Sequence, residues 1–473
     1  MSTLADGLAN IPEEYPITEF GNPVRMAWGV ILIAFATFCI LCVASTLWLQ
    51  YFFFQSSVQM NTLLQVGSGT IGVQAGSSAE QTASDARSLA TGTLIRTDRT
   101  NTLSQATITF RDPNYDNQLV ASVTLMGDTS TRLRQAWQPR FEWTSGYYNI
   151  EFEGLNGEMN VIIAEGLQHD IEVSVRESDT EIRILEPGRY QLTGQLGQVM
   201  VTNWEGEVLI IGPEDVSARL IPPSHRGVFR TIQDEIVVEP ASVNLLTNST
   251  LDVFEPEDYE TDNPALPDIL RGWDCSTNYE FVNRLPLGDY QNATAPDGLR
   301  DSFRLLREGA TNNVGTGCRQ DFSEPGIDVT GYANVTLRAR VYVDSQAISG
   351  CGEQASECPL MMRVRFAVPE RDANGDIIEG EYEERIWIHG VYAMLDPLSP
   401  WPLICNTCRR DHVRVYQDVW YIYESDNLLN VFQPGEEPTH IREVEFYASG
   451  HDYDVYVSEI SLLASGPIVS NPS

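Results

Sequence analysis

The sequence predicts a mainly β protein in which a single N-terminal transmembrane helix precedes two all-β domains. Residues 27–54 contain no charge and are almost wholly apolar. From Ser56 onward, short runs rich in Val, Ile and Thr alternate with Gly, Asn, Asp and Pro, a pattern typical of strands and turns. No run in this part suggests the long crossover helices that a parallel sheet requires, which argues against an α/β fold.

The apolar stretch at 27–54 is long enough to cross a bilayer, because roughly 20 apolar residues span its hydrocarbon core. Arg25 is the last charge before it and Glu80 is the first after it. Trp28 and Trp48 lie near its two ends, as interfacial aromatic residues do. A cleaved signal peptide has a basic leader and an apolar core of about 7–15 residues. The leader here is acidic, so we expect an uncleaved anchor.

The orientation of the anchor follows from the charges beside it. Arg25 is the only basic residue near either end, which predicts a cytoplasmic N-terminus. An even number of cysteines after the span suits an oxidising compartment. We therefore expect a single-pass protein of the cell membrane whose C-terminal bulk is extracytoplasmic. The six cysteines are Cys275, Cys318, Cys351, Cys358, Cys405 and Cys408.

Composition shifts divide the chain into five parts. An acidic, proline-bearing junction at about 238–264 separates two stretches of β character. The predicted parts are a cytoplasmic tail at 1–26, the transmembrane helix at 27–54, a first β domain at 55–240, a second at 241–466, and a tail at 467–473.

The first β domain contains a recognisable series of strand and turn motifs. The run LATGTLIRTD at 89–98 is followed by SQATITF and ASVTLMGDTSTRLRQ, and later by GRYQLTGQLGQVMVTNWEGEVLIIG. With these motifs, residues 62–235 resemble the extracytoplasmic domain of the FecR family. The resemblance implies a bitopic protein with a sensing or protein-binding module. Signalling members also carry a folded sigma-regulating region before the span, and residues 1–26 are too few to supply one.

The second β domain has distinctive ends. It begins with NLLTNSTLD, continues through RGWDCST, and closes with HIREVEFYASGHDYDVYVSEISLLAS. With this frame, residues 243–465 are similar to galactose-binding-like jelly rolls, which include many carbohydrate-binding modules. The resemblance implies a β-sandwich that binds a glycan or protein, and such folds often hold a structural Ca²⁺.

The charge of the chain excludes some partners. The formal net charge is −36, and all but four of the 66 acidic residues lie beyond the span. This negative potential repels nucleic acid and suits cations, basic partners or simple solubility. All 30 basic residues are Arg, so no catalytic Lys is present. Neither an HExxH nor a GxSxG motif occurs, and we expect a non-enzymatic protein.

A short acidic segment resembles part of a calcium loop. Asp372, Asn374 and Asp376 occupy alternate positions as in an EF-hand, but the sixth position is Ile377 where that loop needs Gly. Strand-like sequences flank the segment, so a hairpin turn at Asn374-Gly375 is the simpler interpretation. Weak cation binding by the three residues remains the alternative.

The cysteines allow two interpretations. Cys405 and Cys408 form a CxxC which, with Cys351 and Cys358, has the composition of a four-thiolate zinc site. The predicted extracytoplasmic location favours disulfides instead. Local pairing of Cys351 with Cys358 and of Cys405 with Cys408, together with Cys275–Cys318, is one of 15 possible connectivities.

Aromatic residues provide the candidate ligand site. By strand alternation, Arg385, Trp387 and His389 share one face, and Tyr421 and Tyr423 share another. If these faces line a concave platform, sugar rings would stack on the aromatics while Arg and His donate to hydroxyls. The alternative is that Trp and Tyr fill the core of the sandwich.

Together these observations predict a membrane-anchored cell-envelope protein whose ectodomain binds an extracytoplasmic glycan or protein. Two alternatives are a FecR-type transmembrane signal transducer and an accessory subunit of a larger membrane or cell-surface complex. No cofactor is expected apart from the possible Ca²⁺.

Overall fold

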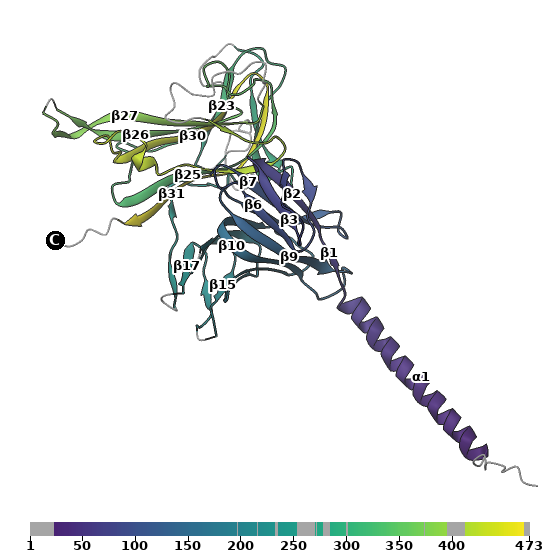
Figure 1. The fold of residues 1–473 in the computed structure, drawn as a ribbon. Coiled ribbons are helices and arrows are strands. Elements are labelled where there is room, and N and C mark those ends of the chain that lie inside the picture. The colour runs from purple at the N-terminus through teal and green to yellow at the C-terminus, as the bar shows by residue number, and fades with distance from the viewer. Residues whose placement is uncertain are drawn as a thin grey trace, which may run out of the picture. The chain divides into compact units, whose positions relative to one another are not determined.

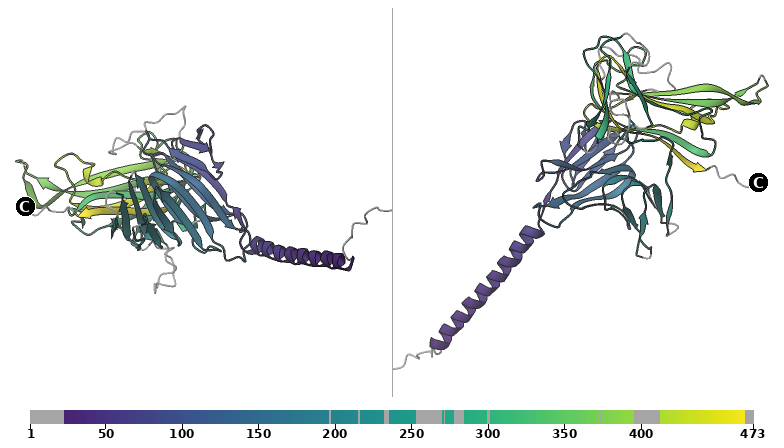
Figure 2. Two further views of the ribbon diagram at one scale, coloured as in Figure 1. Left: turned by 60° about the horizontal axis from the view of Figure 1, so that its bottom comes forward. Right: turned by 180° about the vertical axis from the view of Figure 1, so that it is seen from behind.

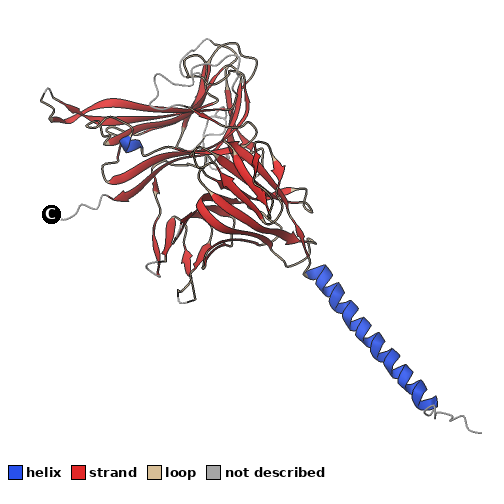
Figure 3. Ribbon diagram, in the orientation of Figure 1, coloured by secondary structure: helices blue, strands red, loops and turns tan. Residues whose placement is uncertain are grey.

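The computed structural model describes residues 23–195, 197–214, 216–231, 235–252, 270, 272–277, 284–298, 301–372, 374–394 and 412–467. Strands dominate these residues, as the sequence predicts (Figure 3). By contacts the chain forms two compact units, residues 1–56 and 57–473. The prediction of a mainly β fold with one apolar N-terminal helix is therefore confirmed.

The first unit contains helix α1 (Pro23–Phe54). Within residues 24–54, the most apolar 18-residue window has a mean hydropathy of 2.6, and none of that window is buried. A 31-residue helix is about 46 Å long, which exceeds the roughly 30 Å of a bilayer's hydrocarbon core. Length and composition therefore allow α1 to span a membrane (Figure 1).

In the second unit, strands β1 to β18 form a closed barrel. Their bounds are β1 Ser57–Gln59, β2 Asn61–Ser68, β3 Ile71–Ala75, β4 Gln81–Ala83, β5 Arg87–Ser88, β6 Thr93–Thr97, β7 Gln105–Asp112, β8 Gln118–Leu125, β9 Ser130–Pro139, β10 Tyr148–Ile163, β11 Ile171–Glu177, β12 Thr180–Ile184, β13 Gly188–Gln195, β14 Gln198–Glu205, β15 Val208–Ile211, β16 Arg219–Ile221, β17 His225–Arg230 and β18 Glu235–Pro240.

Strand β10 connects the two halves of the barrel. Its first part pairs with β9 and β11, and its last part pairs with β8 and β13. The register shifts between Glu153 and Asn156, and Gly157 follows with φ +112°. A Cβ at Gly157 would lie 2.6 Å from the Cα of Thr129, so only glycine fits where the strand changes sheets.

Strands β19 to β31 form a sandwich of two sheets, one ordered β21-β22-β31-β25-β29 and the other β20-β23-β30-β26-β27-β28. Strand β19 pairs with β31, and β24 pairs with β30. Their bounds are β19 Val243–Asn244, β20 Asp274–Thr277, β21 Asp289–Thr294, β22 Asp301–Arg307, β23 Val314–Asp321, β24 Ile327–Asp328, β25 Tyr332–Gln346, β26 Leu360–Arg371, β27 Ile377–Tyr392, β28 Val413–Arg414, β29 Trp420–Glu424, the 3-10 turn η2 Leu428–Asn430, β30 His440–Gly450 and β31 Tyr453–Pro467.

Each β part has its own apolar core. In the barrel, Phe110 and Phe152 meet edge to face with 6.0 Å between ring centroids, and both are fully buried. In the sandwich, Phe446 lies edge to face with both Trp273 and Phe303. Burying side chains of this size stabilises a fold by about 1.5–3 kcal/mol each, so these clusters hold the sheets together.

The barrel and the sandwich also contact one another within the second unit. Gln105 of β7 receives a hydrogen bond from the Ile422 amide at 3.0 Å and donates one to the Ile422 carbonyl. The Tyr416 amide donates to the Gly67 carbonyl at 2.8 Å. Figure 2 shows the blue and teal strands of the barrel beside the green and yellow strands of the sandwich in both views.

Candidate functional site

The aromatic residues expected to form a ligand platform lie in the core of the sandwich. Trp387 and His389 point inward from β27 and are only 1% and 4% exposed. Their rings stack with 5.9 Å between centroids, and His389 stacks on Tyr423 at 4.4 Å. Tyr421 is 1% exposed in the same core. Rings buried in this way cannot stack on a sugar, so the platform prediction is corrected to the core-filling alternative.

The misassigned face has a physical cause. Alternation along β27 separates Trp387 and His389 from Ile386 and Ile388 but does not say which pair faces inward. A platform on the Trp387 face would place the two isoleucines in the core, yet Ile386 is 36% exposed. On β29 both faces are buried. Tyr421 and Tyr423 pack in the sandwich core, and on the other face Ile422 is 3% exposed and its backbone bonds Gln105 of the barrel.

Arg385 takes part in surface ion pairs. Its guanidinium lies 2.5 Å from Glu383 and 3.1 Å from Glu436. The hydrogen bond to Glu383 is the largest influence raising the pKa of Arg385. The side chain is therefore occupied by neighbouring carboxylates and is separated from the buried stack of Trp387 and His389.

The acidic segment after β26 forms a tight turn. The Asp372 carboxylate accepts backbone hydrogen bonds from Asn374 at 2.8 Å and from Asp376 at 3.0 Å. These hydrogen bonds, the one from Asp376 first, lower the pKa of Asp372. The carboxylate thus stabilises the hairpin itself, as the turn interpretation expects, while cation binding here stays a prediction.

Four of the six cysteines that follow α1 in the sequence form two disulfides. Cys275 of β20 bonds Cys318 of β23, and Cys351 bonds Cys358, which are two of the three pairs in the connectivity named above as one of 15. The buried imidazole of His412 lies close to the sulfurs of Cys351 and Cys358. Its Nδ1 accepts a hydrogen bond from the Gly390 amide at 2.8 Å. The predicted pairing of Cys405 with Cys408 lies outside the described residues.

A polar cleft lies on the outward face of the seven-stranded sheet. Its volume is about 280 Å³. Strands β23, β26 and β30 build it, because they alternate core residues such as Val364 and Phe446 with polar side chains that face the other way. The lining consists of Asn313, Val314, Gly315, Arg319, Ser356, Arg363, Arg365, Glu445, Tyr447 and Ser449.

Ion pairs organise the floor of this cleft. Arg363 lies 2.5 Å from Glu445 and 3.5 Å from Glu443, and Arg365 lies 2.9 Å from Glu443. Both carboxylates are buried, at 2% exposure for Glu445 and 5% for Glu443. Burial raises the pKa of Glu445 to about 7 despite the opposing attraction of Arg363. Burial likewise raises the pKa of Glu443.

The rim of the cleft offers an aromatic ring and small polar groups. The Arg363 guanidinium lies over the ring of Tyr447 at 5.9 Å. Asn313, Ser356 and Ser449 add amide and hydroxyl groups that both donate and accept. Sugar hydroxyls both donate and accept hydrogen bonds, so this mixture of groups beside an aromatic ring suits them. The sequence does not reveal the cleft, because Arg and Glu at alternate strand positions are typical of an ordinary solvated face.

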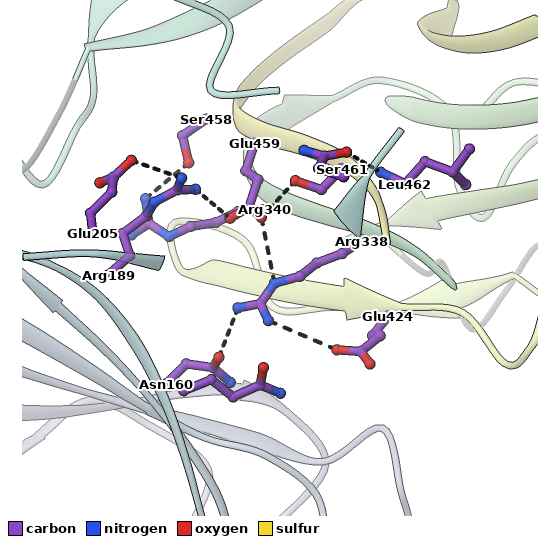
Figure 4. A network of polar contacts seen from close by, with 12 residues as sticks. Asn160, Arg189, Glu205, Arg338, Arg340, Glu424, Ser458, Glu459, Ser461 and Leu462 are labelled. Carbon is purple, nitrogen blue, oxygen red and sulfur yellow. Dashed lines mark hydrogen bonds and ion pairs between the residues drawn. The ribbon is translucent and has the colours of Figure 1, made fainter. Parts of the chain in front are cut away.

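A second polar centre joins the sandwich to the barrel (Figure 4). Glu459 of β31 lies 3.3 Å from Arg189 of β13 and 3.7 Å from Arg338 of β25. Burial acts to raise the pKa of Glu459, but the two guanidiniums outweigh it and the pKa is lowered. The cavity beside these residues holds only about 10 Å³, so this centre connects the two parts rather than binding a ligand.

No protein-family model and no curated protein sequence matches the chain. Among solved structures, the chain is similar to a candidate anti-sigma factor from Parabacteroides distasonis, at 15% identity and a TM-score of 0.23, over 31% of this chain and 59% of that one. It is similar to a CBM22 xylan-binding domain from Paenibacillus barcinonensis, at 11% identity and a TM-score of 0.19, over 47% and 96%. It is also similar to a family 30 carbohydrate-binding module from Clostridium thermocellum, at 12% identity and a TM-score of 0.21, over 40% and 90%.

Proposed function

We propose that this protein is a membrane-anchored, non-enzymatic binding protein of the cell envelope that holds an extracytoplasmic glycan in the cleft of its sandwich. Helix α1 would be the anchor, with the N-terminus in the cytoplasm. The observation that carries the proposal is the cleft itself, where Tyr447, Asn313 and Ser449 surround a floor of paired Arg and Glu side chains. Nucleic acid is an unsuitable ligand for a chain with net charge −36.

The arrangement of charges favours binding over catalysis. Glycoside hydrolysis requires an acid and a second carboxylate on opposite sides of the scissile bond. In the cleft, Glu443 and Glu445 are close to guanidiniums and deeply buried behind them. Their ion pairs fix the orientation of Arg363 and Arg365, which are then pre-organised to donate to hydroxyl oxygens.

The test is a broad glycan array probed with the full-length protein in detergent, followed by calorimetry on any hit. We expect Tyr447→Ala and Arg363→Met each to weaken binding at least about tenfold, which corresponds to about 1.4 kcal/mol. Glu379→Gln, an exposed substitution on β27, is the matched control and should bind as the wild type does. No binding by the wild type, or equal binding by all variants, would refute the glycan assignment.

Signal transduction is a second candidate function. Buried ion pairs join the sandwich to the barrel in one compact unit, and the barrel directly follows the membrane helix in the sequence. A ligand-dependent change could therefore reach the membrane-proximal part of the chain. If the protein signals, deletion of residues 1–24 should abolish the cellular output while leaving ligand binding intact.

A role as an accessory subunit of a membrane complex would give a different result. In that case other subunits would co-purify with the full-length protein in mild detergent at a fixed ratio. A glycan-binding protein that acts alone would purify without them.

A further inference from the structure

The barrel displays a cluster of exposed aromatic rings on the loop between β9 and β10. We name residues 140–147 the aromatic loop. Trp143 is 65% exposed and Tyr147 is 51% exposed. Trp137, which precedes the loop near the end of β9, is 36% exposed. Large rings so open to solvent usually mark a surface that contacts something apolar.

The aromatic loop begins close to the point where the chain leaves helix α1. Helical bonding continues past Phe54, because the Gln55 amide donates to the Tyr51 carbonyl at 2.8 Å. Strand β1 begins at Ser57, only two residues after Gln55, and Ser57 pairs directly with Pro139. Consecutive Cα atoms are about 3.8 Å apart, and antiparallel partners lie about 4.5–5.5 Å apart. Pro139 is therefore within about 10 Å of Ser56, whatever angle the helix adopts.

Buried hydrogen bonds hold the base of the aromatic loop. Asp112, only 3% exposed, accepts from Gln138 at 2.6 Å on one side of the loop and from the Tyr148 hydroxyl at 2.7 Å on the other. Asn114 donates to the Arg140 carbonyl at 3.1 Å. Both ends of the loop are thus fixed to the same buried carboxylate.

Contacts within the aromatic loop also order its tip. The Thr144 hydroxyl donates to the Phe141 carbonyl at 2.8 Å, and Phe141 and Trp143 stack with 4.7 Å between ring centroids. The exposed rings are consequently part of a defined surface. Such a surface loses little conformational entropy when it meets a partner.

We propose that the aromatic loop is a second membrane contact, in which Trp143 and Tyr147 enter the interfacial layer of the same bilayer that α1 spans. Trp and Tyr favour that layer because they combine an apolar ring with a polar N–H or O–H group. The loop itself carries only Arg140 and Glu142 as charges, so it brings no net negative charge to the lipid although the whole chain is strongly acidic. The proposal rests on α1 being a membrane anchor but is independent of glycan binding.

Photo-crosslinking tests this proposal. The substitution Trp143→p-benzoylphenylalanine is made in the full-length protein, which is reconstituted in phosphatidylcholine nanodiscs and irradiated. Mass spectrometry then measures the fraction of protein bearing one lipid adduct. The same substitution at Trp48 of α1 reports on the anchor, and the substitution at Trp204, a half-buried residue of β14, reports on incidental contact.

We expect lipid adducts at positions 143 and 48 and at least fivefold fewer at position 204. Adducts at 48 combined with a background level at 143 would overturn the proposal while leaving the anchor intact. Absence of adducts at 48 would remove the anchor, and the loop contact with it. Equal adducts at 143 and 204 would show that the barrel meets lipid without using this loop, which also overturns the proposal.

A competing occupant of the loop gives a distinct result. If the rings serve as a sugar-stacking site, addition of the bound glycan would suppress adducts at position 143 and leave those at 48 unchanged. Lipid contact predicts that the glycan has no effect at either position.

Discussion

The Arg338 guanidinium of β25 donates a hydrogen bond to the side-chain oxygen of Asn160 on β10 at 2.7 Å, although 178 residues separate the two in sequence. Arg338 is 6% exposed and Asn160 is 3% exposed. A buried guanidinium is costly unless polar partners surround it. The contact therefore specifies how the sandwich docks on the barrel, because another arrangement would leave this charge without its partners (Figure 4).

Removing Arg338 should destabilise the docked pair of β parts. The substitution Arg338→Ala leaves Glu459 buried with one guanidinium fewer, and disruption of a buried ion pair costs about 3–5 kcal/mol. Urea unfolding monitored by tryptophan fluorescence measures the loss. Arg99→Ala is the control. Arg99 pairs with Asp128 and both side chains are exposed to solvent, so this substitution should lower the free energy of unfolding by less than about 1 kcal/mol. Equal unfolding midpoints for the two variants would contradict the expected role of Arg338.

The two disulfides should contribute unequally to stability. Loop closure predicts about 4 kcal/mol for Cys275–Cys318, which are 43 residues apart, and about 2 kcal/mol for Cys351–Cys358, which are 7 apart. The double substitutions Cys275→Ala with Cys318→Ala, and Cys351→Ala with Cys358→Ala, allow the comparison by thermal unfolding. A larger loss for the shorter loop would show that local packing around Cys351, and not chain entropy, dominates.

Trp387 should behave as a core residue. Trp387→Ala removes a fully buried ring from the stack with His389, and such truncations cost about 3–5 kcal/mol. The loss is measured by chemical unfolding at fixed detergent concentration. Trp387→Phe is the control and should recover much of the stability. If Trp387→Ala instead kept the wild-type stability and lost only ligand binding, the residue would belong to a site and not to the core.

Stability should decrease as the pH rises toward neutrality because of Glu445. Its pKa is raised to about 7 by burial, so the folded state binds this proton more tightly than the unfolded state does. The resulting stabilisation is complete below the ordinary glutamate pKa near 4.5 and is lost as the pH passes through 7. Melting temperatures at pH 5 and pH 8 should therefore differ more for the wild type than for Glu445→Gln. The exposed substitution Glu379→Gln should retain the wild-type difference.

The sequence was sufficient to predict those features that depend on local pattern. The uncharged run at 27–54 predicts a helix such as α1, and short β-branched runs predict strands. The pairing of Cys275 with Cys318 was one of several open connectivities, and the structure selects it because the two residues face each other across β20 and β23.

The features that the sequence could not predict depend on contacts between distant segments. A strand shows two faces but not which one is covered, so the sequence left Trp387 open between a ligand platform and the core. The cleft at Arg363 and Glu445 requires β26 to lie beside β30, although these strands are distant along the chain. Likewise, β29 lies at the edge of its sheet in the sandwich, and the sequence does not show that the buried Ile422 on this strand bonds Gln105 of the barrel.

The position of strand β31 has a consequence for how the protein is made. This strand, Tyr453–Pro467, lies inside its sheet and pairs with β19, β22 and β25, and its Glu459 reaches Arg189 of the barrel. If the chain is exported from its N-terminal anchor, as proposed above, β31 crosses after all the other described strands. The barrel can thus close during export, whereas the sandwich and its docking contacts must wait for nearly the whole chain to cross. Exported intermediates would carry a finished barrel and an open sandwich, the state that envelope chaperones and proteases would meet.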